Sequence, residues 1–117
     1  MSRTRAKGTE FENKALEVLA TRFPNAKRLP LNSPLGDLDN LPIVMECKNQ
    51  QAMTLADWMN QAAKSGERAG KMYAVIHKRR GKNAFKAYVT QELDGYTEVL
   101  YGYQRYLKII DKYPELA

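Results

Sequence analysis

The N-terminal part of the chain carries a helical pattern of apolar residues. They recur every three or four positions as far as Pro24: Phe11, Ala15, Val18, Leu19 and Phe23. Thr9 and Glu12 have the spacing of a capping box, in which each side chain bonds a free N–H at the helix start. These signals predict a helix over about residues 9–22, followed by a short strand over residues 26–31.

The middle of the chain alternates between extended and helical patterns. Residues 37–39 and 43–48 form two short runs around a turn at Asn40-Leu41-Pro42, which is typical of a β-hairpin. Small and apolar side chains then recur at helical spacing over residues 54–70, beginning with Thr54. The sequence therefore predicts two paired strands followed by a helix that can lie close on a sheet.

Two alternating strand patterns and a long helical pattern complete the chain. The strands, at residues 71–78 and 84–90, are joined by a basic turn. The helix, at residues 92–112, has an apolar stripe that we expect to pack on the sheet: Tyr96, Val99, Leu100, Tyr103, Leu107 and Ile110. The order of helix, three strands, helix, two strands and helix predicts an α/β fold in which helices flank a mixed sheet.

Composition and charge narrow the class of partner. The 117 residues fit a single domain, with a basic segment at residues 1–7 and a tyrosine-rich region at residues 92–117. Lys and Arg outnumber Asp and Glu by 19 to 13, which gives a net charge of +6. This charge favours a polyanionic binding partner, and nucleic acid is the first candidate. One cysteine excludes an internal disulfide, and one histidine excludes the usual zinc ligand sets. No apolar stretch approaches the ~20 residues that span a bilayer, so we expect a soluble, intracellular protein.

Two charged residues interrupt the apolar strand at residues 43–48. Because side chains alternate across a strand, Glu46 and Lys48 share one face, and the hairpin returns Asp37 alongside them. Two adjacent carboxylates repel each other unless they share a cation, and oxygen ligands favour Mg²⁺ or Mn²⁺. We therefore expect a metal held by Asp37, Glu46 and the backbone carbonyl of Cys47. Lys48 would then face a phosphate or an attacking water.

An aspartate followed by Glu-x-Lys on the next strand resembles the active site of the PD-(D/E)xK nuclease superfamily. The stretch from Lys7 to about Leu93 is similar to the Holliday junction resolvase and phage endonuclease branch of that group. The similar segments are KGTEFE, GDLDNLP, IVMECK, NQAA and YAVIHKRRGKNAFKAYVT. Gly36 departs from the superfamily pattern, in which a proline can precede the aspartate.

This resemblance implies a restriction-endonuclease-like fold and a metal-dependent DNA endonuclease. It also implies a location in the cytoplasm of a bacterial cell or a phage-infected host. It implies a catalytic triad of Asp37, Glu46 and Lys48. It also implies that Glu12 is a first-helix carboxylate near the metal and that Gln61 is a helical amide facing the site. The plainer alternatives are a cross-strand ion pair for the triad, capping for Glu12 and an exposed helix position for Gln61.

The basic turn supplies candidate DNA contacts. With Lys71 and Lys86 on the same hairpin, four residues suit phosphate contacts that fix position without reading sequence: Lys78, Arg79, Arg80 and Lys82. His77 fits either a hydrogen-bonded surface histidine or a further DNA contact. Asp39 is best explained as a turn residue, and Cys47 and Trp58 as core residues.

Three functional hypotheses follow from these residues. The first is a Holliday junction resolvase that hydrolyses branched DNA during recombination. The second is a nicking or processing nuclease of phage or mobile-element origin with no preference for DNA structure, and the third is a non-catalytic basic nucleic-acid-binding module. Tyrosines outside the apolar stripe of the last helix favour a homodimer, which would suit symmetric cutting of two strands, although a monomer with an exposed helix also fits.

Overall fold

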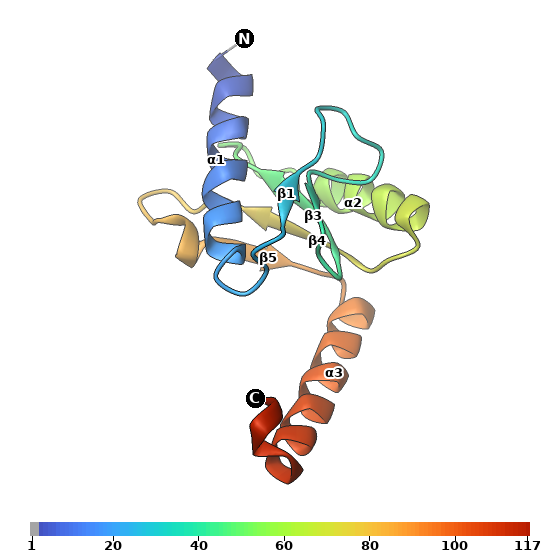
Figure 1. Ribbon diagram of the computed structural model, residues 1–117. Coiled ribbons are helices and arrows are strands. Elements are labelled where there is room, and N and C mark those ends of the chain that lie inside the picture. The colour runs from blue at the N-terminus through green and yellow to red at the C-terminus, as the bar shows by residue number, and fades with distance from the viewer. Residues whose placement is uncertain (1–2) are drawn as a thin grey trace.

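The computed structural model describes the backbone of residues 3–117 and the side chains of residues 8–117. Its elements follow the predicted order (Figure 1). The helices are α1 (Arg3–Leu19), α2 (Leu55–Ala69) and α3 (Leu93–Lys112), with 3-10 turns η1 (Ala84–Lys86) and η2 (Pro114–Leu116). The strands are β1 (Lys27–Arg28), β2 (Leu38–Asp39), β3 (Val44–Lys48), β4 (Tyr73–His77) and β5 (Tyr88–Thr90).

The strands form one mixed sheet in the order β1-β2-β3-β4-β5. The pairs β1–β2, β2–β3 and β4–β5 are antiparallel, and only β3 and β4 run parallel among the described strands. A parallel pair needs a crossover connection, which α2 provides. Because β3 and β4 point the same way, Lys48 and His77 lie at the same end of the sheet.

Two helices cover opposite faces of this sheet (Figure 1). Ile76 of β4 packs with Phe11 and Ala15 of α1, whereas its neighbour Val75 packs with Trp58 and Ala62 of α2. Successive side chains of a strand point to opposite faces, so one strand contributes to both halves of the core. The prediction that Trp58 belongs to the core is confirmed, since it is 4% exposed.

The helix starts differ from the sequence prediction. α1 begins at Arg3 and ends at Leu19, so Thr9 lies inside the helix and the predicted capping box is wrong. Arg, Ala and Lys residues upstream of Gly8 are good helix formers, which lets the helix extend toward the N-terminus. Of the basic segment at residues 1–7, residues 3–7 belong to α1, and Met1 and Ser2 lie outside the described residues. At α2, Thr54 is the N-cap residue, as predicted, but its side chain makes no capping hydrogen bond.

The strand predicted over residues 84–90 is shorter in the structure. Asn83 Oδ1 accepts a hydrogen bond from the N–H of Phe85 at 3.1 Å and starts the 3-10 turn η1. Asn side chains often compete in this way with regular pairing. Only Tyr88–Thr90 pair with β4 as β5.

α3 does not pack on the sheet, contrary to the sequence prediction. It leads away from the rest of the molecule (Figure 1), and none of its residues is buried. α1 and α2 already cover the two sheet faces, and Gln91 and Glu92 alone separate β5 from α3. Among residues 3–117, no helix is both long enough and apolar enough to cross a membrane.

Candidate active site

The candidate site lies just before β2 begins, where Asp37 runs alongside β3. The N–H of Asp37 donates to the carbonyl of Met45 at 3.0 Å, which closes the short antiparallel pairing. One step further along β3, the N–H of Cys47 has no strand partner on that side and donates to Asp37 Oδ2 at 2.7 Å. A half-buried N–H needs an acceptor, and the carboxylate supplies it. The sequence prediction that the hairpin brings Asp37 alongside β3 is confirmed.

Gly36 makes this turn possible. Its φ of +102° is a conformation that side-chain-bearing residues rarely adopt, and a Cβ there would lie 2.9 Å from Val44 Cγ1 and 3.8 Å from Glu46 Oε1. Proline is excluded as well, because its ring fixes φ near about −65°. The residue that departs from the nuclease pattern is therefore the one that this backbone requires.

Glu46 is a buried carboxylate on the α2 face of the sheet. It is 2% exposed, and Ser65 Oγ of α2 donates to Glu46 Oε1 at 2.9 Å. Burial, followed by the nearby charge of Asp37, raises the pKa of Glu46 to about 7, although the Ser65 hydrogen bond and the Lys48 charge act in the opposite direction. The two carboxylates are thus close enough to repel each other.

Lys48 and Gln61 meet beside this pair. Lys48 Nζ donates to Gln61 Oε1, which joins the end of β3 to α2. Gln61 and Ser65 are four residues apart, so they lie on the same face of α2 and reach Lys48 and Glu46 respectively. Gln61 is an exposed residue of α2, as the plainer alternative predicted, and its side chain also contacts Lys48.

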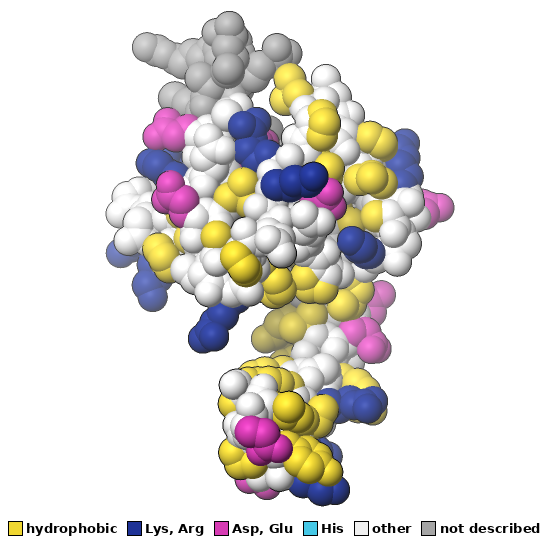
Figure 2. Space-filling view, in the orientation of Figure 1, with side chains coloured by type: hydrophobic (Ala, Val, Ile, Leu, Met, Phe, Trp, Pro, Cys, Tyr) yellow, Lys and Arg dark blue, Asp and Glu magenta, His cyan; other side chains and the backbone are white. Residues whose placement is uncertain are grey.

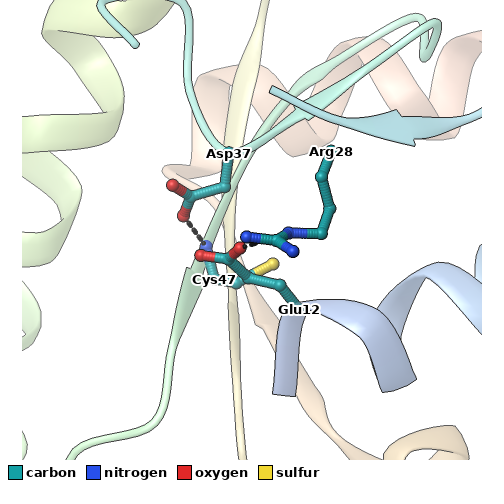
Figure 3. A network of polar contacts seen from close by, with 4 residues as sticks. All are labelled: Glu12, Arg28, Asp37 and Cys47. Atoms are coloured by element: carbon teal, nitrogen blue, oxygen red, sulfur yellow. Dashed lines mark hydrogen bonds and ion pairs between the residues drawn. The ribbon is translucent and has the colours of Figure 1, made fainter. Parts of the chain in front are cut away.

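Glu12 reaches the same region from α1. Arg28 Nε of β1 donates to Glu12 Oε2 at 3.0 Å (Figure 3). Burial, then the charge of Asp37, raises the pKa of Glu12, while Arg28 and Lys48 oppose the shift. Figure 3 shows the carboxylates of Glu12 and Asp37 approaching Cys47 from different elements. The capping role that was the plainer explanation of Glu12 is excluded, because α1 begins well upstream.

The sequence analysis did not identify two residues of the site. Ser65 holds Glu46, and Arg28 holds Glu12. Ser65 could have been found from its i,i+4 spacing to Gln61 on the predicted helix. No sequence signal marked Arg28, because its bond to Glu12 depends on how α1 crosses β1.

The basic turn after β4 adjoins the site. The N–H of Lys78 donates to the carbonyl of Lys48 at 3.0 Å, so the turn begins beside the end of β3. Three of the predicted DNA-contacting side chains are exposed there: Lys78, Arg80 and Lys82. Arg79 is half-buried, and its guanidinium lies 4.4 Å from the ring centroid of Tyr88. These residues present positive charge and an exposed aromatic ring beside Lys48.

Two residues do not lie where the sequence analysis placed them. His77 is 5% exposed, with its ring between those of Trp58 and Tyr88 and Nε2 2.8 Å from Thr90 Oγ1. It is therefore a buried histidine, its pKa is lowered by burial, and its position does not favour a direct DNA contact. Lys71 lies at the opposite end of β4 from the basic turn, with its Nζ 3.3 Å from the carbonyl of Leu41.

The remaining two predictions concern strand positions. Cys47 points away from Glu46 and packs against the core under α1, and burial raises the pKa of its thiol, as expected of a core cysteine. Asp39 is a strand residue of β2 that pairs with Lys27 of β1, so the prediction that it is a turn residue is wrong. Asn40, the next residue, has φ of +62°. The turn thus lies directly after Asp39.

The carboxylates of the site are the candidate ligands of a metal ion. Within the part of the chain that the structure describes, no three His, Cys, Asp or Glu side chains are close enough to form a metal-binding group. Asp37 and Glu46 nevertheless form a crowded pair of hard oxygen donors, which suits a divalent cation of the Mg²⁺ type. The carbonyl of Cys47 lies on the same side of β3 as its N–H, toward Asp37, because backbone groups alternate along a strand.

No protein-family model, curated protein or solved structure matches this chain. The candidate site therefore rests on the chemistry and geometry of its own residues.

Proposed function

We propose that this protein is a divalent-metal-dependent DNA endonuclease with a restriction-endonuclease-like fold. The observation that carries the proposal is the convergence of Asp37, Glu46 and Lys48, each held by a separate partner. Such positioning is what a hydrolytic site needs, since catalytic groups must be fixed before the substrate arrives. The element order and the mixed sheet are compatible with the nuclease group that the sequence resembles.

In this proposal Lys48 acts on the phosphate side of the reaction. Its ammonium group, oriented by Gln61, would donate to a phosphate oxygen and stabilise the negative charge that develops during attack. The oxygen of a water molecule forms the new bond to phosphorus and the water releases one proton to solvent. One phosphorus–oxygen bond of the DNA backbone breaks, and the leaving oxygen takes up one proton from solvent. Lys48 could also orient the attacking water.

Asp37, Glu46 and the Cys47 carbonyl would hold the Mg²⁺ or Mn²⁺ ion, with Glu12 nearby. When bound, the ion would neutralise the paired carboxylates and polarise the phosphate. Asp37 keeps its carboxylate aimed into the site through the Cys47 N–H, while Ser65 fixes Glu46. Arg28 restrains Glu12 and limits the net negative charge that an approaching phosphate would meet.

The proposed substrate is branched DNA such as a Holliday junction. The exposed Lys78, Arg80 and Lys82 begin directly beside Lys48, where they can bind phosphates on either side of the cleaved bond. A pocket of about 270 Å³ lies at this end of the sheet, bordered by Lys78, Arg80 and Tyr88. Basic groups next to an exposed aromatic ring suit the unpaired or unstacked bases of a branch point.

The test compares a synthetic four-way junction with a linear duplex of the same sequence, each with Mg²⁺ or with EDTA. The parent protein should nick the junction only with Mg²⁺, and Lys48→Ala should bind the junction with unchanged affinity but not cut it. Lys71→Ala, at the far end of β4, is the matched control and should cut normally. Equal cutting of both DNAs would indicate a general nuclease, and binding without cutting in Mg²⁺ and Mn²⁺ would indicate a non-catalytic module.

A further inference from the structure

α3 is a long helix that has no buried residue. Its N-terminal end is attached through Glu92, which accepts from the hydroxyl of Tyr73, and through Gln91 Nε2, which donates to the carbonyl of Tyr73 at 3.2 Å. Beyond this point no residue is buried, and Leu93 is 79% exposed. In proteins, most of the stability of a helix comes from packing of an amphipathic face.

The exposed face of α3 has the spacing of a coiled-coil seam. The apolar residues of this α3 stripe alternate in steps of three and four: Leu93, Tyr96, Leu100, Tyr103, Leu107 and Ile110. An average repeat of 3.5 residues keeps one seam facing a second helix, whereas a helix that packs on a sheet needs no such repeat. Val99 and Tyr106 lie on one flank of the stripe and widen it. Figure 2 shows hydrophobic side chains along the projecting helix.

We propose that the α3 stripe is a dimer interface, in which α3 pairs antiparallel with α3 of a second copy of this chain. The charges along the helix favour this orientation. Its N-terminal part is acidic, with Glu92, Asp94 and Glu98, whereas Arg105, Lys108 and Lys112 make the remainder basic apart from Asp111. An antiparallel pair places each acidic part beside the partner's basic part, while a parallel pair would align like charges.

The stripe is self-complementary about its own midpoint. A two-fold axis between Leu100 and Tyr103 places Leu93 opposite the partner's Ile110, Tyr96 opposite the partner's Leu107, and Leu100 opposite the partner's Tyr103. Every apolar side chain of the seam then meets another, as an isologous interface requires.

The size of the face suits a stable dimer. Tyr96 is 47%, Leu100 50%, Tyr103 59% and Leu107 44% exposed. If the eight apolar side chains of the stripe and its flank each bury roughly half of a ~150–200 Å² surface, the helix contributes about 700 Å². This is close to the ~800 Å² per partner of a standard specific interface.

Sedimentation velocity over a range of protein concentrations tests the pairing. The parent chain should sediment as a dimer, and Tyr103→Glu should sediment as a monomer. Tyr101→Glu is the matched control, because it makes the same chemical change two residues away, on the side of α3 facing away from the stripe. It should remain a dimer. Circular dichroism shows whether each variant keeps the helices of the main body, and Leu100→Ala, which adds no charge, should weaken association without abolishing folding.

Cysteine cross-linking tests the orientation, in a Cys47→Ser background. Mixing Leu93→Cys chains with Ile110→Cys chains should give a disulfide-linked dimer, whereas neither variant alone should cross-link. Cross-linking of Leu93→Cys with itself would show parallel pairing and overturn the proposed orientation. A parent chain that is monomeric at all concentrations, or a Tyr103→Glu dimer, would overturn the interface. Neither experiment includes DNA or metal, so both outcomes are independent of the nuclease proposal.

Discussion

The backbone N–H of Cys47, in β3, donates to the carboxylate of Asp37, the residue directly before β2. The same side chain thus completes the hydrogen bonding of the strand and faces Glu46, whose pKa it helps to raise. The Asp37 carboxylate therefore has a structural role and a proposed catalytic role. Different substitutions of Asp37 should separate the two.

We expect Asp37→Ala to lose both cleavage and stability, and Asp37→Asn to lose cleavage only. Alanine leaves the Cys47 N–H without an acceptor, which costs on the order of 1–3 kcal/mol of unfolding free energy. The asparagine side-chain oxygen can still accept that bond but carries no charge. Urea unfolding and junction cleavage measure the two effects, with Asp39→Ala as the control that should cut normally. Full activity of Asp37→Asn would exclude the carboxylate from the reaction.

Glu46→Gln should make the metal-free protein more stable at alkaline pH. Between pH 4.5 and about 7 the folded protein keeps a proton on Glu46 that the unfolded chain has released, so the free energy of unfolding falls as pH rises through this window. Glutamine removes this loss, so Glu46→Gln should be more stable than the parent by on the order of 3 kcal/mol above pH 7 and differ little from it below pH 4.5. Thermal unfolding in EDTA, at several pH values across this range, measures the stability difference between the parent and Glu46→Gln.

Comparing the parent with Glu46→Gln at each pH removes the contributions of the other titrating groups to the stability difference. Glu12, whose pKa is also raised, shifts both curves in the same direction as Glu46, and His77, whose pKa is lowered, shifts both in the opposite direction. A stability difference that does not change with pH would mean that Glu46 is ionised normally in the folded protein.

Gly36→Ala should destabilise the protein by about 2–4 kcal/mol, through strain at positive φ and a contact 2.9 Å from Val44 Cγ1. Gly81→Ala separates these causes, because Gly81 also has positive φ, +72°, but has open space around the position of a Cβ. It should cost about 1 kcal/mol. Equal unfolding midpoints in urea for the two variants would show that the space beside Val44 is not limiting.

Removing charges from the basic turn should weaken DNA binding in a salt-dependent way. Lys78→Ala and Arg80→Ala are each expected to lower the slope of log affinity against log salt by about 1, because each lost phosphate contact releases one counterion fewer. Lys71→Ala should leave the slope unchanged. Fluorescence anisotropy with a labelled junction at several salt concentrations gives the slopes. A larger effect at Lys71 than at Arg80 would move the DNA to the other end of the sheet.

The sequence alone was sufficient for the element order and for the strand that carries the site. Alternation predicted that Glu46 and Lys48 share a face and that Cys47 points the other way, because a period of two depends only on local backbone geometry. It could not predict the Glu12–Arg28 pair, which depends on the crossing of α1 over β1.

The two largest errors have the same origin. The start of α1 and the placement of α3 were both inferred from local signals, a capping spacing and an apolar stripe, that fit more than one environment. α1 and α2 occupy the two sheet faces, and no window of sequence shows which helix covers which face.

All the residues that build the candidate site, from Glu12 to Ser65, precede the last helix in the chain. Substitutions in α3 can therefore alter how copies associate without changing any group that would touch a phosphate. In evolutionary terms, the proposed chemistry and the assembly are separate traits of one short chain, free to diverge at different rates.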